Sequence, residues 1–123
     1  MDLTITIRGK QWPARYSLRA AMAVEDKFGS VKKALFEQGE TSGERIRARI
    51  FVLHEILMAG KAWEEMENGV PADVPPTEEQ LLDMIAFAKS GTVMEQMIRV
   101  INDDEQTDFE AEEPDDRKNP QAT

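Results

Sequence analysis

Apolar and polar side chains alternate in two short runs at the start of the chain. The first run places an apolar residue at every second position, namely Leu3, Ile5 and Ile7. This period of two favours a strand with one buried face, and β-branched residues such as Ile5 and Ile7 are common in strands. Gly9 and Lys10 form a turn before a return strand in 11–16, and Pro13 places that strand at a sheet edge because proline has no amide hydrogen to donate. We therefore predict an N-terminal β-hairpin, which must lie on another element because a lone hairpin is marginally stable in water.

From residue 17 onward the apolar spacing changes to three and four residues, which is typical of helices that bury one face. Ser17 and Ser30 occupy N-cap positions, and Gly29 closes the first helix. The widest apolar face belongs to the central helix, whose main stripe consists of Ile46, Ile50, Leu53 and Leu57. The pattern predicts about five helices, over 18–28, 31–38, 42–67, 78–90 and 93–102.

Glycine and proline divide the second half of the chain. Gly60 is expected to end or kink the central helix, and the proline-rich stretch 68–76 is typical of a loop. Gly91 is expected to end the helix that follows this loop. The last two helices are each expected to begin with a capping box, Thr77 with Gln80 and Thr92 with Glu95.

Acidic residues are concentrated at the C-terminal end. The 123 residues carry a formal net charge of −9, and 103–123 contains nine acids against two bases, Arg117 and Lys118. A like-charged run with one aromatic residue, Phe109, cannot bury enough apolar area to offset its ordering entropy. We predict a mainly α (α+β) fold: a domain over 1–102, with the N-terminal β-hairpin packed on a bundle of about five helices, and a disordered acidic tail over 103–123.

The residue types needed for most catalytic sites are scarce. The chain has no cysteine, and its one histidine, His54, begins the run HEILM, which lacks the second histidine of the zinc-binding HExxH pattern. Lys61 follows a glycine but no glycine lies where a phosphate-binding loop would need it. We therefore expect a protein that is not an enzyme and that binds neither a metal nor a cofactor.

Membranes and nucleic acids are also unfavourable partners. The longest apolar-rich window, 46–59, is interrupted by charged residues, so no membrane span is expected, and the N-terminus shows no signal-peptide pattern. Arg45 and Arg49 share one helix face, but a nearly neutral domain and an acidic tail oppose binding to a phosphate backbone. We expect these arginines to pair with local acids such as Glu44 or to dock the chain's own tail.

Methionine and tryptophan suggest a protein-binding surface. Methionine adapts to varied apolar partners, and five of the seven methionines lie from residue 58 onward: Met58, Met66, Met84, Met94 and Met97. Met97 fits a core position, whereas Met66 and Met94 are the better candidates for exposure; filling of core gaps remains the alternative for both. Trp63 could plug a hinge or anchor a contact. The candidate partner-binding residues are Trp63, Met66, Met84, Met94, Arg45 and Arg49.

The stretch YSLRAAMAVEDKFGSVKKALFEQGE carries a resemblance to a known family. A hairpin followed by a helix with Leu18, Glu25, Phe28 and Gly29, then a short helix over 31–35, resembles the tail assembly chaperones of long-tailed phages and the related tail proteins of gene transfer agents. The long central helix, the proline-rich break and the final helices extend the resemblance over 3–102.

The resemblance implies a function in phage tail assembly. Such chaperones bind the long helical tape-measure protein in the host cell cytoplasm before the tail tube polymerises, and they are absent from the mature virion. A ribosomal frameshift often yields a longer form that recruits tail tube subunits, and an A-rich slippery run could encode Lys118 and Asn119; the nucleotide sequence would show it. A homo-oligomer remains open. The alternatives are a small phage or prophage regulatory protein whose acidic tail mimics nucleic acid, and a minor structural tail protein.

Overall fold

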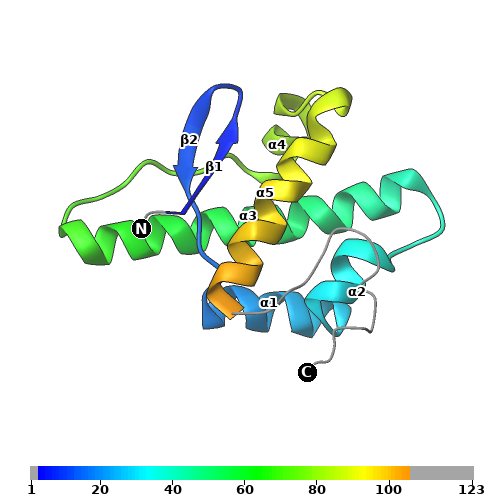
Figure 1. Ribbon diagram of the computed structural model, residues 1–123, viewed down its shortest axis with the longest axis horizontal. Helices are drawn as coiled ribbons and strands as arrows, with labels where there is room; N and C mark the ends of the chain where they lie inside the picture. The colour runs from blue at the N-terminus through cyan, green and yellow to red at the C-terminus, as the bar shows by residue number, and fades with distance from the viewer. Residues whose placement is uncertain (1–2, 106–123) are drawn as a thin grey trace.

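The computed structural model describes residues 3–105, and the fold is mainly helical with an N-terminal hairpin, as predicted (Figure 1). The predicted disorder of the acidic tail concerns residues that, from 106 onward, lie outside this range. Along the chain the elements are β1 (Thr4–Ile7), β2 (Lys10–Pro13), α1 (Leu18–Phe28), α2 (Val31–Phe36), α3 (Ser42–Asn68), α4 (Glu78–Met84), the 3-10 helix η1 (Phe87–Lys89) and α5 (Ser90–Glu105).

The hairpin is antiparallel and buries one face. Ile5 pairs with Trp12, and both side chains are buried in the core. The turn lies one residue earlier than predicted, at Arg8 and Gly9, and both residues have positive φ angles, of 53° and 81°. Two left-handed residues give the type of turn whose twist matches that of the flanking strands. Lys10 is consequently the first residue of β2.

The outer edge of β1 is covered by side chains of α5. The Thr6 amide donates to Oε1 of Gln96 at 2.8 Å, and Nε2 of Gln96 donates to the Thr6 carbonyl at 3.4 Å. Arg99 donates to the carbonyl of Thr4 at 3.3 Å. The side-chain amide of Gln96 thus takes the place that a neighbouring strand would occupy, which satisfies an otherwise open sheet edge.

α3 is one continuous helix of 27 residues, so it does not end at Gly60, which was one of the two alternatives predicted there. Gly60 is buried in mid-helix, where a Cβ would overlap the carbonyl of Pro13 and the amide nitrogen of Ala14. The Arg15 amide also donates to the carbonyl of Ile56, at 3.2 Å. The glycine therefore lets the chain leaving β2 approach the backbone of α3, and it does not interrupt the helix.

α1 and α2 pack together along one side of α3 (Figure 1). The predicted N-caps are confirmed, because the hydroxyl of Ser17 accepts from the Ala20 amide and that of Ser30 from the Lys33 amide. α3 itself begins with a capping box between Thr41 and Glu44, which the sequence analysis missed. These helices contribute Val24, Leu35, Val52 and Leu57 to the hydrophobic core.

The segment after the proline-rich loop differs most from prediction. The capping box of Thr77 and Gln80 is confirmed, but α4 ends at Met84, well before Gly91. η1 follows, and α5 begins at Ser90, so Gly91 lies in the first turn of α5 and the capping box predicted at Thr92 is wrong. At its other end α5 continues to Glu105, so the predicted boundary between 102 and 103 falls inside a helix.

Replacement of Gly60 by alanine should destabilise the protein. The new methyl group would overlap backbone atoms, which cannot rotate away, and a cost of about 3 kcal/mol is expected from overpacking of this kind. Gly91→Ala is the matched control, because a Cβ there meets nothing within 4 Å and alanine favours a helix by up to about 1 kcal/mol over glycine. Urea unfolding of both variants measures the difference. Equal stabilities of the two variants would contradict the role given to Gly60.

Candidate partner-binding site

A pocket of about 560 Å³ lies between the N-terminal half of α3, α4, η1 and the N-terminal half of α5. We call it the α3–α5 pocket. Ten of its fourteen lining residues are apolar, and the four polar ones are Ser42, Arg45, Arg49 and Ser90. The apolar lining consists of Ile46, Ile50, Leu53, Leu81, Leu82, Ile85, Phe87, Val93, Met94 and Met97.

The lining side chains become more exposed from the floor of the pocket to its edge. Leu53 and Leu81 are fully buried and form the floor. Ile46 and Leu82 are half-buried, and Phe87 is 81% exposed. This grading follows from the early end of α4, because the chain after Met84 runs in an extended conformation into η1 and leaves the neighbouring apolar faces without a cover.

Arg45 and Arg49 bring positive charge to this apolar lining. Nε of Arg49 donates to the carbonyl of Leu35 at 2.8 Å, which fixes the side chain between α2 and α3. Burial and the neighbouring charge of Arg45 lower the pKa of Arg49. Neither arginine forms an ion pair with a carboxylate of residues 3–105. The pocket therefore favours a ligand that brings negative charge with its apolar groups.

Glu44, the expected local partner of these arginines, is engaged elsewhere. Its Oε1 accepts hydrogen bonds from the amides of Glu40 and Thr41, at 2.8 and 3.2 Å. These backbone hydrogen bonds lower the pKa of the Glu44 carboxyl, and the charge of Arg45 adds a smaller effect. Pairing of Arg45 and Arg49 with Glu44 is therefore wrong, and the alternative, docking of the tail, concerns residues outside 3–105.

Met94 is buried, so of the two alternatives for this residue the structure supports the filling of a core gap and not exposure. It is only 9% exposed and contributes to the lining of the α3–α5 pocket. The reason is that α5 packs against both α3 and β1, so its buried face is wider than one stripe. That face contains Val93, Met94, Met97, Ile98, Val100 and Ile101.

Met84 lies on another side of α4. It is half-buried and lines a second hollow, of about 590 Å³, between the hairpin turn and the start of α5. Polar residues, including Arg8, Lys89 and Gln96, make up much of that lining. Met84 does not line the α3–α5 pocket.

Trp63 and Met66 lie on the C-terminal half of α3, away from the pocket. Met66 is 73% exposed, as expected, and Trp63 is partly exposed. The guanidinium of Arg15 stacks over the Trp63 ring, 4.1 Å from its centroid. Of the six candidate residues, the structure therefore brings together Arg45, Arg49 and Met94, and it separates the other three from them.

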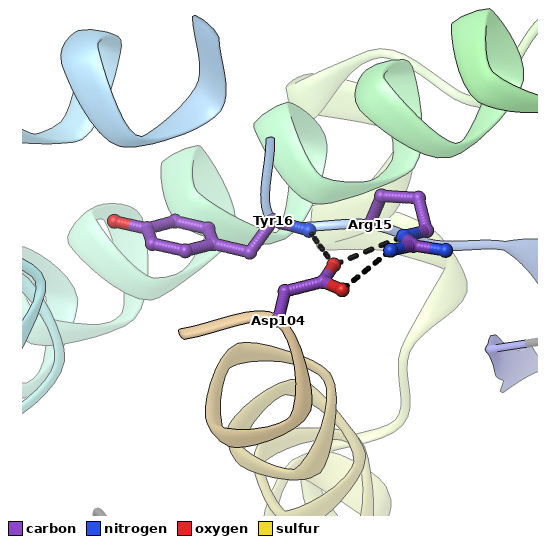
Figure 2. A network of polar contacts seen from close by, with 3 residues as sticks. All are labelled: Arg15, Tyr16 and Asp104. Carbon is purple, nitrogen blue, oxygen red and sulfur yellow. Dashed lines mark hydrogen bonds and ion pairs between the residues drawn. The ribbon is translucent and has the colours of Figure 1, made fainter. Parts of the chain in front are cut away.

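The end of α5 is held by a polar network that the sequence analysis missed (Figure 2). The Asp104 carboxylate accepts two hydrogen bonds from Arg15, at 3.0 and 2.6 Å, and one from the Tyr16 amide at 2.7 Å. The Asp104 side chain is only 9% exposed. A signal existed in the sequence, since Asp104 follows Ile101 by three residues and so continues the buried face of the helix.

Membrane spans and metal-binding clusters are both absent from residues 3–105. No helix in residues 3–105 is apolar over a length that would cross a bilayer. Within the same residues, histidine and carboxylate side chains nowhere gather in a group of three that could hold a metal ion. Comparisons with protein-family models, with curated proteins and with solved structures gave no match to this chain.

Removal of the Asp104 charge should loosen the end of α5. Asp104→Asn leaves the Arg15 guanidinium without its bidentate partner, and because Arg15 is still partly exposed we expect a loss of about 2 kcal/mol, below the range for a fully buried pair. Asp103→Asn is the matched control, because Asp103 is exposed one residue earlier. Thermal and urea unfolding measure both. A loss no larger than that of the control would contradict the structural role of Asp104.

Proposed function

We propose that the α3–α5 pocket binds an amphipathic helix of another protein. This proposal rests on the uncovered apolar lining of the pocket. The exposure of its side chains increases from buried Leu53 through half-buried Ile46 and Leu82 to exposed Phe87. Its volume of about 560 Å³ is large enough for several side chains. A helix places apolar side chains at intervals of three and four residues along one face, and such a face fits a pocket lined by α3, α4, η1 and α5.

Charge and flexibility of the lining support a helical protein ligand. Arg45 and Arg49 would form ion pairs with an acidic residue at the border of the partner's apolar face. Such pairs would fix the orientation of the partner helix. Met94 and Met97 lie deeper, and methionine adjusts its shape to the side chain it meets. These properties suit a binder of related segments along a long helical protein.

The partner that we propose is the tape-measure protein of a long-tailed phage, so the chain would act as a tail assembly chaperone without a catalytic role. The order of hairpin, two short helices, long central helix, proline-rich loop and final helices is the order that the family resemblance implies. Covering the apolar face of tape-measure helices in the host cytoplasm would keep that protein soluble until the tail tube polymerises. The chaperone then leaves and is absent from the virion.

Coexpression with a tape-measure fragment tests this function. We expect a soluble complex on size exclusion, and Phe87→Glu should weaken it at least tenfold because a carboxylate would replace the apolar group at the pocket edge. Leu18→Glu is the matched control: Leu18 is 85% exposed and lies on α1, outside the pocket lining, so the affinity should change less than twofold. Titration calorimetry of the purified complex gives the two affinities.

Two results would contradict the proposal. A fragment that stays insoluble and forms no complex would argue against the chaperone function. Equal loss of affinity in Phe87→Glu and Leu18→Glu would instead show that binding does not depend on the α3–α5 pocket. Both residues are highly exposed, so neither replacement should unfold the protein, and urea unfolding of each variant checks this.

A further inference from the structure

The α3–α5 pocket lies within reach of the chain's own C-terminal segment. α5 forms one wall of the pocket, and the chain continues from its last residue, Glu105, for another 18 residues. Met97, in the pocket lining, precedes Glu105 by eight helical residues, a distance of about 12 Å along the axis. Four extended residues span at most about 14 Å, so Phe109 can reach the Met97 end of the pocket, and the residues after it can reach farther.

The composition of this segment matches the pocket. Phe109 is the one large apolar residue in 106–123, and Asp108 and Glu110 flank it. The segment contains six acids, five of them within 108–115, and the only bases follow at Arg117 and Lys118. An aromatic ring between carboxylates complements an apolar pocket that carries two guanidinium groups.

The charge of the pocket itself favours an anionic occupant. Both guanidinium groups line the pocket, and burial, with a smaller contribution from the like charge of Arg45, lowers the pKa of Arg49. Within residues 3–105 no carboxylate forms an ion pair with either group. A carboxylate placed between them would relieve this repulsion, and the acids of 108–116 lie within 11 residues of the end of α5, on the part of the chain that continues from the pocket wall.

We propose that residues 108–116 occupy the α3–α5 pocket of their own chain, with Phe109 in its apolar part and the acids facing Arg45 and Arg49. The segment then competes with the partner helix and is displaced when that helix binds. Only this competition rests on the function proposed above; occupancy of the pocket by the segment does not.

A nitroxide spin label on the full chain tests the occupancy. The chain has no cysteine, so Ala111→Cys accepts the label at a single position. Asp104 bonds to the Tyr16 amide, so Leu18 on α1 lies near the end of α5. A segment that stays out of the pocket should therefore broaden the methyl signals of Leu18 at least as much as those of Ile46 and Leu82. We expect the opposite order, with Ile46 and Leu82 broadened most.

Variants in the labelled chain identify the contacts. Phe109→Ala and Arg45→Glu should each restore the Ile46 and Leu82 signals, and 0.5 M NaCl should restore them in part because it screens the charges. Gln121→Ala lies outside the proposed segment and should leave the broadening unchanged. Broadening that is strongest at Leu18, or that persists in Phe109→Ala, would overturn the inference. Broadening of an isotope-labelled chain by a separate spin-labelled chain would overturn its intramolecular form.

The competition is measured separately. If the segment fills the pocket in about 70–90% of molecules, Phe109→Ala should tighten binding of the tape-measure fragment about three- to tenfold. An unchanged affinity would overturn the competition. If the fragment binds neither form, the proposed function fails, while the methyl signals still report whether the segment occupies the pocket.

Discussion

The carboxylate of Asp104 ties the last turn of α5 to the segment between the hairpin and α1, and the position of α5 decides much of the remaining structure. Arg15 donates two hydrogen bonds to this carboxylate and the Tyr16 amide a third, so the contact fixes both direction and register of the helix. Gln96, two turns earlier, holds the same helix to β1. With its last turn and its middle fixed in this way, α5 crosses α3 (Figure 1), and its N-terminal half forms one wall of the α3–α5 pocket.

The pocket results from the short length of α4. A helix that continued from Met84 to Gly91 would have had two further turns to pack over α3, whereas the extended residue Ile85 and the single 3-10 turn of η1 cover less of it. Phe87 is consequently exposed beside Ile46 and Leu82, which are themselves half-buried. Apolar side chains gathered in one concave place, with two cations among them, are more informative than single exposed residues such as Leu18, because isolated exposed apolar residues are normal on a soluble surface.

Local signals in the sequence were sufficient for the hairpin, for the caps at Ser17, Ser30 and Thr77, and for the mainly helical class, because each depends on residues a few positions apart. The predictions failed where a residue distant in the sequence determines the local structure. From the sequence Gly60 resembles a helix breaker, but in the structure it makes room for the chain leaving β2. Asp104 likewise resembles the start of an acidic tail, but in the structure its carboxylate binds Arg15. Met94 lies off the single apolar stripe of α5 that the sequence shows, but α3 and β1 both pack against the helix and widen its buried face. The pocket itself could not be predicted, because it depends on where α4 ends.

An intramolecular occupant of modest strength would shield the apolar lining of the α3–α5 pocket from water. A tethered segment faces its site at an effective concentration in the millimolar range, so even weak contacts from one aromatic ring and a few carboxylates can fill the pocket much of the time. A partner helix can bury more apolar area than a single phenylalanine and can therefore displace the segment when it is present. The displaced segment keeps its negative charge, which would then repel other copies of the complex. The same acidic segment would thus limit self-association in two ways. In the free protein it would cover the apolar pocket, and in the complex with the partner helix its charge would repel other copies.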